Sequence, residues 1–160
     1  MKTNMKAKGF CHQESHTLPY AAEDLFNVVI AIDHYPHFLP WAVKARTYHH
    51  QGDHFLADLT IGYGPFTETY TSKVTYEGKE NICATHVKGP FKHLTTRWSF
   101  VPISEKETHV TFHIAFELKS LLFQAMLEKI FEKACKTFFK AFENRCHTLY
   151  GEKNGAGEGI

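Results

Sequence analysis

Residues 54–77, with the sequence HFLADLTIGYGPFTETYTSKVTYE, show the pattern that decides the fold. Apolar and polar side chains alternate before the Gly64-Pro65 pair, and a Gly-Pro pair favours a tight turn. A period of two places alternate side chains on opposite faces of a strand, so the stretch predicts an antiparallel hairpin with one face in the core. The residues expected on that inner face before the turn are Phe55, Ala57, Leu59, Ile61 and Tyr63.

The same alternation continues for about 75 residues after Trp41. Turn-forming residues interrupt it at 51–53, 64–65, 77–79, 89–90 and 104–106. Interruptions at this spacing predict a meander of six antiparallel strands. The inner-face residues expected on its last two strands are Leu94, Trp98 and Phe100, then Val110, Phe112, Ile114 and Phe116.

Helical and extended segments flank this meander. Residues 10–18 read as a strand, residues 20–32 have helical spacing, and Asp33 is a candidate cap for one further turn that ends at residues 38–41. Residues 120–150 keep helical spacing for about eight turns and predict a long amphipathic helix. The order predicts an α+β helix-grip fold, in which a curved seven-stranded antiparallel sheet surrounds a long C-terminal helix, with two short helices near the N-terminus.

Length and composition favour a single folded domain. The chain has 160 residues, 43% of them hydrophobic and 22% charged, with a net charge of +1. We expect one domain over residues 1–151 and a glycine-rich tail over residues 152–160. The near-zero charge argues against generic binding to nucleic acid, and we expect no DNA partner.

The N-terminus and the cysteines indicate the compartment. No apolar segment follows the basic N-terminus, and no run is long enough to span a membrane. The four cysteines form no Cys-x-x-Cys pair, which argues against a zinc site and a disulfide scaffold. We expect a cytoplasmic protein, with a peripheral location on the inner membrane as the alternative.

Aromatic residues, at 14% of the chain, gather at one end of the predicted sheet. Alternate connections of a meander lie at the same end, and the connections at one end are apolar whereas those at the other are charged. Exposed apolar loops need an explanation, because loops normally present polar groups. They either plug the end of the core or form the mouth of an apolar pocket that touches a bilayer. The residues concerned are Phe38, Leu39, Trp41, Phe66, Phe91, Leu121, Leu122 and Phe123.

The twelve histidines and the carboxylates give no strong catalytic or metal signal. Members of the pairs His12/His16 and His109/His113 lie roughly 13 Å apart on an extended strand, too far to share a metal. We interpret the histidines as solvated or hydrogen-bonded groups on outward strand faces and turns. The best acid–base pair is Asp58 with Glu68 across the hairpin, although Asp58 has the parity of the water-facing side. We therefore expect no enzyme, no metal and no catalytic cofactor.

Several motifs in order resemble the coenzyme Q-binding START-like family, whose bacterial members are grouped with the RatA ribosome-association toxins. The resemblance covers roughly residues 8–151 and rests on the segments YPHFLPW (35–41), TYTSKV (69–74), GPFKHL (89–94) with WSF (98–100), and AFENRC (141–146) before LYG (149–151). At Ala42 the family commonly has a cysteine, so any role of that thiol does not transfer. The short N-terminus is similar to that of bacterial members.

The resemblance implies a START-like domain that binds an isoprenoid quinone in its cavity and supports quinone synthesis and respiration without catalysis. The ribosomal branch implies a regulator that binds the large subunit and blocks subunit association, and the wider superfamily includes small-molecule cyclases. An aromatic rim and a deep cavity favour the quinone, which is a bound ligand here rather than a cofactor. The residues we expect to bind it are Phe38, Leu39, Trp41, Tyr63, Phe66, Tyr70, Phe91, Trp98, Phe100, Phe112, Leu122, Phe123 and Leu127.

Overall fold

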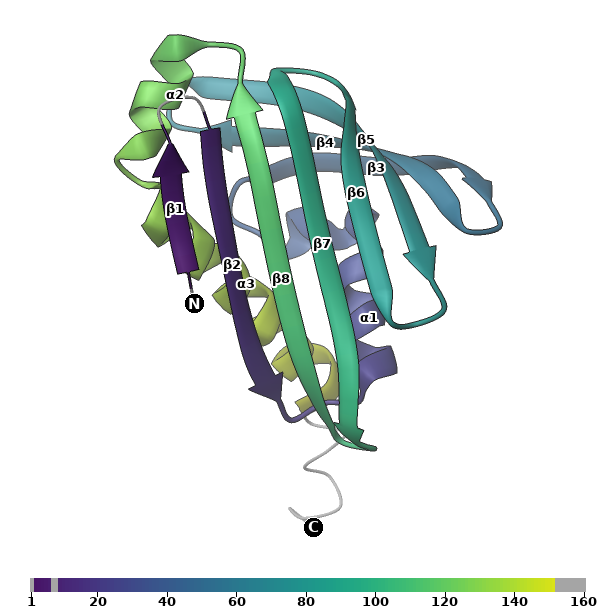
Figure 1. The fold of residues 1–160 in the computed structure, drawn as a ribbon. Coiled ribbons are helices and arrows are strands. Elements are labelled where there is room, and N and C mark those ends of the chain that lie inside the picture. The colour runs from purple at the N-terminus through teal and green to yellow at the C-terminus, as the bar shows by residue number, and fades with distance from the viewer. Residues whose placement is uncertain (1, 7–8, 152–160) are drawn as a thin grey trace.

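The computed structural model describes residues 2–6 and 9–151 and contains one antiparallel sheet (Figure 1). The strand order is β1-β2-β8-β7-β6-β5-β4-β3. The predicted meander is confirmed as β3 to β8, and the predicted N-terminal strand pairs with the last of them. The strand bounds are β1 Lys2–Lys6, β2 Gly9–Leu18, β3 Ala42–Gln51, β4 His54–Tyr63, β5 Phe66–Glu77, β6 Asn81–Lys88, β7 Phe91–Ser104 and β8 Glu107–Leu118.

Strand β1 adds an eighth strand to the seven that the sequence predicts. It pairs with β2 in register Lys2↔Gln13 through Lys6↔Gly9. The predicted glycine-rich tail at 152–160 lies outside the described residues.

The helices lie on the face of the sheet that curves around them (Figure 1). This arrangement confirms the helix-grip fold class. Residue Asp33 lies inside the 3-10 turn rather than capping it, since the cap position is Ala31. The bounds are α1 Ala22–Ile30, the 3-10 helix η1 Ile32–His37, α2 Leu121–Glu128, α3 Phe131–Cys146 and a π-helical turn η2 His147–Gly151.

The C-terminal helix is divided, which periodicity did not predict. The backbone at Ile130 leaves the helical region, with φ −125° and ψ −2°, so α2 and α3 are separate helices. Residues 120–150 therefore do not form the single continuous helix that their spacing predicts. The buried residues of α3 are Phe131, Cys135, Phe139, Phe142 and Cys146.

Two local features position α2 over one end of the sheet. The Ser120 side chain accepts a hydrogen bond from the backbone N–H of Phe123 at 3.1 Å and caps the helix. The buried Gln124 side chain accepts one from the backbone N–H of Leu118 at 3.2 Å. These contacts hold the first turn of α2 against the end of β8.

The turn between β6 and β7 passes close to the inner face of β5. Gly89 has φ +140°, and a Cβ atom there would lie 2.6 Å from the Cβ of Tyr70. Only glycine permits this approach. The turn thereby places the ring of Phe91 edge-on against the ring of Tyr70, with centroids 5.2 Å apart.

Candidate ligand-binding cavity

A cavity of about 260 Å³ lies between the concave face of the sheet and the helices. Strands β4 to β8 form one wall, and α1, η1, α2 and α3 close the other sides. Its walls are almost entirely apolar, so the cavity suits the hydrocarbon part of a ligand.

Small side chains on the inner face of the central strands make this space. Ala57 pairs with Ser72 across β4 and β5, and Ala84 pairs with Thr96 across β6 and β7. All four line the cavity. The neighbouring inner positions hold large side chains, so the hollow occurs where the wall residues are small.

Aromatic residues close the deep end of the cavity. Trp98 packs against Phe112 with ring centroids 4.6 Å apart, and Phe138 lies 5.1 Å from Phe112. The Tyr35 hydroxyl is also buried here and donates a hydrogen bond to the backbone carbonyl of Val29 at 2.5 Å. The deep end is therefore a packed aromatic floor.

The opposite end, which we call the mouth, is bounded by Trp41, Tyr63, Phe66, Phe91 and Phe123. Phe66 at the start of β5 and Phe123 on α2 meet across it, with ring centroids 4.4 Å apart. Beyond the mouth, Leu121 and Leu122 at the start of α2 are 83% and 73% exposed. The aromatic end that the sequence predicts thus includes the entrance of an enclosed cavity.

The structure places most of the residues expected to bind ligand on the cavity wall, with three exceptions. Phe38 packs against the outer side of Tyr35 and Phe142, because η1 ends beside it. Phe100 lies in the core behind Trp98, and Leu122 points into solvent. The residues that line the wall are Leu39, Trp41, Tyr63, Phe66, Tyr70, Phe91, Trp98, Phe112, Phe123 and Leu127.

The cavity wall also contains two polar residues, Ser72 and Thr96, that are not among the residues expected from the sequence to bind ligand. Their strand parity nevertheless indicates the inner face. Ser72 has the parity of Tyr70 and Val74, and Thr96 has the parity of Leu94 and Trp98. Both line the cavity, and Ser72 is 5% exposed. Burial raises the pKa of Tyr70 to about 12, so its phenol stays protonated at neutral pH.

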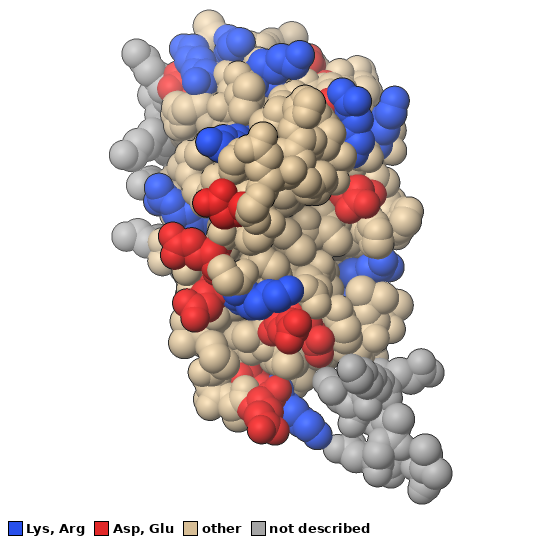
Figure 2. All heavy atoms as spheres, turned by 90° about the vertical axis from the view of Figure 1, so that its right-hand side faces the viewer, with Lys and Arg blue, Asp and Glu red and all other residues tan. Residues whose placement is uncertain are grey.

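Basic and apolar side chains surround the outside of the mouth. Figure 2 shows Lys and Arg gathered at the end of the molecule where α2 lies, with Asp and Glu concentrated below. Lys44, Lys88 and Lys119 are exposed there, and within the described chain none of them forms an ion pair. We call this surface the lysine–leucine rim, and it consists of Val43, Lys44, Val87, Lys88, Lys119, Leu121 and Leu122.

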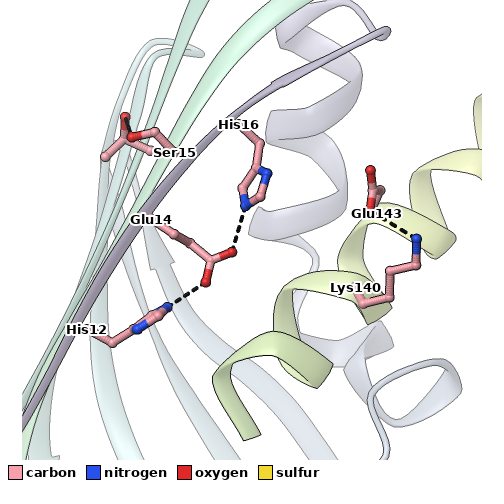
Figure 3. Close-up of polar contacts among 7 residues, drawn as sticks. His12, Glu14, Ser15, His16, Lys140 and Glu143 are labelled. Atoms are coloured by element: carbon pink, nitrogen blue, oxygen red, sulfur yellow. Dashed lines mark hydrogen bonds and ion pairs between the residues drawn. The ribbon is translucent and has the colours of Figure 1, made fainter. Parts of the chain in front are cut away.

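A buried polar group on β2 corrects the expectation that the histidines face outward. Glu14 accepts hydrogen bonds from Nε2 of His12 at 2.5 Å and from Nε2 of His16 at 2.7 Å. The side chains of His12 and Glu14 are 0% and 3% exposed, while that of His16 is 42% exposed. All three point from β2 toward α3 (Figure 3). The fold tolerates the burial of these polar side chains because they form hydrogen bonds with one another.

Helix α3 covers this group with aromatic rings. The ring of Phe139 stacks on His16 with centroids 4.2 Å apart, and Phe131 approaches His12 edge-on. Burial is the main reason that the pKa of the Cys135 thiol is raised to about 12, and the negative charges of Glu14 and Glu132 contribute to the same shift. Cys135 also lines the cavity, so it is a protonated wall group rather than a nucleophile.

The proposed acid–base pair does not form. Asp58 pairs in register with Thr71 and faces outward, whereas Glu68 lies opposite Ile61 and lines the mouth. Burial opposes ionisation of Asp58, but hydrogen bonds from Thr71, Tyr48 and Arg46 outweigh it and lower its pKa. Asp58 therefore connects three strands on the outer face of the sheet.

Groups of three or more His, Cys, Asp or Glu residues that could hold a metal ion do not occur among the described residues. None of the helices in the described part of the chain has the length and hydropathy needed to cross a bilayer.

Comparison with known proteins identifies relatives of this chain. The model of the family described as "Polyketide cyclase / dehydrase and lipid transport" matches residues 18–143. The chain is 31% identical to the ribosome association toxin RatA of Pseudomonas aeruginosa over 139 residues, covering 87% of this chain and 96% of that protein. It is 29% identical to the mitochondrial coenzyme Q-binding protein COQ10 of Dictyostelium discoideum over 141 residues, covering 86% of this chain and 69% of that protein.

The fold is also found in a solved enzyme structure. The Zhui aromatase/cyclase from Streptomyces superposes with a TM-score of 0.78 over 95% of this chain and 99% of that chain, at 14% identity. That likeness concerns the fold alone. The family match, the RatA and COQ10 relatives and the helix-grip architecture agree, and the chain belongs to the polyketide cyclase/dehydrase and lipid transport family.

Proposed function

We propose that this protein is a non-catalytic carrier that binds an isoprenoid quinone, or a lipid of similar chemistry, in its cavity. The observation that supports this function best is an enclosed apolar cavity whose mouth opens beside exposed leucines. Burial of apolar ligand surface stabilises the complex by about 25 cal/mol per Å². Similarity to the coenzyme Q-binding protein COQ10 favours a quinone among apolar ligands.

The lysine–leucine rim is the surface through which the carrier would load and unload at a membrane. Exposed leucines enter the boundary between headgroups and acyl chains, and lysines are attracted to anionic lipids. Both kinds of residue surround the same opening, so a bound lipid passes between bilayer and cavity without crossing water. The proposed location is therefore peripheral to a membrane surface.

The decisive experiment is the identification of the lipid that copurifies with the protein from its native host. We expect a quinone in the organic extract by mass spectrometry. The Ala84→Leu variant fills the hollow and should copurify with much less quinone. The matched control is Ala115→Leu, because Ala115 lies on the outer face of the same sheet, and its quinone content should equal that of the wild type. A wild-type protein that carries no quinone would contradict the proposal.

A second candidate function is regulation of ribosome assembly by binding to the large subunit. It is supported by the similarity to RatA and by the basic rim. Non-specific attraction of lysines to RNA weakens steeply with salt, so only a specific contact with the ribosome would persist at moderate salt. Cosedimentation with large ribosomal subunits that survives moderate salt, together with an absence of bound quinone, would favour this function over the carrier.

A further inference from the structure

We propose that Tyr70, Ser72 and Thr96 form a polar subsite that receives the oxygen-bearing ring of the ligand, while the hydrocarbon tail leaves through the mouth. This inference rests on the proposed lipid-binding function and adds the orientation of the ligand and the groups that recognise its head.

The three hydroxyls lie on one face of the sheet and on two strands separated by one other. Tyr70 and Ser72 occupy consecutive inner positions of β5, and Thr96 occupies an inner position of β7. Ala84 of β6 pairs with Thr96 on one side and with Val74 on the other. Ser72 lies one inner position before Val74 on β5, opposite His86 of β6, so Ser72 and Thr96 are offset by two residues along the strands.

The spacing of these strands fits a six-membered ring. Two inter-strand spacings of about 5 Å, together with the offset of two residues along the strands, separate the Ser72 and Thr96 positions by about 12 Å. A hydrogen bond of about 2.8 Å from each side leaves roughly 6 Å between the two acceptors. That is the separation of oxygens on opposite carbons of a ring, so a para-quinone or the corresponding hydroquinone is the chemical class that fits.

The described residues supply no side-chain hydrogen-bond partner for these hydroxyls. Within residues 9–151, no side-chain hydrogen bond joins Tyr70, Ser72 or Thr96 to another residue. His86 lies directly opposite Ser72 in register, and its Nε2 atom is buried without a partner in that part of the chain. Polar groups enclosed by apolar surroundings are costly unless they are hydrogen-bonded. Ligand oxygens would supply the missing acceptors.

The size and closure of the cavity determine the direction of the ligand. A cavity of about 260 Å³ lies at or below the ~300–1,000 Å³ of sites that enclose drug-sized molecules. It therefore holds a ring and little more, while a polyisoprenoid tail requires additional space. Trp98 and Phe112 close the deep end, so the tail extends toward the exposed leucines of α2 once the Phe66 and Phe123 rings have separated.

Hydroxyl deletions that preserve side-chain shape test this subsite. The variants are Tyr70→Phe, Ser72→Ala and Thr96→Val, and the control is Thr95→Val, because Thr95 occupies the adjacent, outward position of β7. Affinity is measured for two probes, a short-tailed ubiquinone and the hydrocarbon squalene, by displacement of a fluorescent apolar dye. Each deletion should weaken quinone binding roughly three- to ten-fold and leave squalene binding unchanged. Thr95→Val should change neither.

The outcomes separate the subsite from the carrier function. Equal weakening of quinone and squalene, or no weakening of either, would overturn the subsite while the carrier function stands. The same conclusion follows if the wild type binds squalene as tightly as the quinone. A wild type that binds neither probe would overturn the carrier function, and the subsite with it. Thermal unfolding of each variant verifies that lost affinity does not reflect lost folding.

Discussion

The ring of Phe66 on β5 lies 4.4 Å from the ring of Phe123 on α2, measured between centroids, with 33° between their planes. This contact joins α2 to the sheet across the mouth of the cavity. Since α2 is separated from α3 at Ile130, it is a short helix held at the end of the sheet by this ring pair and by the hydrogen bond between Gln124 and Leu118. The Phe66–Phe123 pair therefore closes the route by which a ligand enters.

Removal of one ring of this pair should accelerate ligand exchange. In Phe123→Ala the mouth loses its closing contact, so the rates of association and dissociation of a short-tailed quinone should both rise, with a smaller change in affinity. Stopped-flow fluorescence measures the two rates. The control is Leu121→Ala, because Leu121 is on the same helix but is 83% exposed. Unchanged rates in Phe123→Ala would mean that ligands enter elsewhere.

The lysine–leucine rim should bind anionic membranes. The double variant Leu121→Ser/Leu122→Ser should lose most of its cosedimentation with vesicles of phosphatidylglycerol and phosphatidylcholine, because the serines cannot enter the bilayer. The matched control is Val101→Ser/Ile103→Ser, since these residues are 54% and 56% exposed at the opposite end of the sheet. Equal loss in both double variants would show that the rim has no special role.

The buried Glu14 should be needed for stability. Loss of one partner of a buried charged network typically costs 3–5 kcal/mol, and Glu14→Ala leaves His12 buried without its carboxylate. We expect a decrease of about 3 kcal/mol in the free energy of unfolding, measured by urea denaturation. The control is Glu132→Ala, because Glu132 forms an exposed ion pair with Lys136 and its loss should have almost no effect on stability. A neutral Glu14→Ala would show that α3 does not depend on this contact.

Acid should weaken the fold partly through Asp58. The pKa of Asp58 is lower in the folded chain than its ordinary value near 4, so the unfolded chain takes up the proton first as the pH falls. The stability that Asp58 contributes is thus present at neutral pH and is lost as the pH falls below about 4 through its folded pKa. Asp58→Asn should be less stable at pH 7 and show a shallower loss of stability in acid. An unchanged acid profile would contradict this assignment.

Much of the fold was predictable because strand alternation is a local property. The turns at Gly64 and Gly89 and the parity of residues such as Phe55 and Trp98 are readable without knowledge of what packs against them. The same parity correctly placed an apolar end near α2, and most of the wall residues expected there line the cavity. The same parity places Ser72 and Thr96 on the inner face, although polar side chains in a strand ordinarily indicate an outer face.

The buried group on β2 shows where local reasoning fails. His12, Glu14 and His16 share the parity of buried Phe10 and Leu18, yet three polar side chains in alternation resemble a solvated face. Burial becomes acceptable only when the carboxylate receives both imidazoles and aromatic rings of α3 cover them. That condition depends on residues about 120 positions away in the chain.

The sequence by itself determined the order of the six meander strands, their inner and outer faces and the end at which apolar residues gather, because each follows from periodicity and turn chemistry between near neighbours. Only the tertiary structure decided that the C-terminal helix divides at Ile130, that small residues at Ala57 and Ala84 leave a hollow, and that Phe66 meets Phe123 across its mouth. These features arise from the volume left between elements distant in the chain, and packing volume is a property of the assembled fold rather than of any segment.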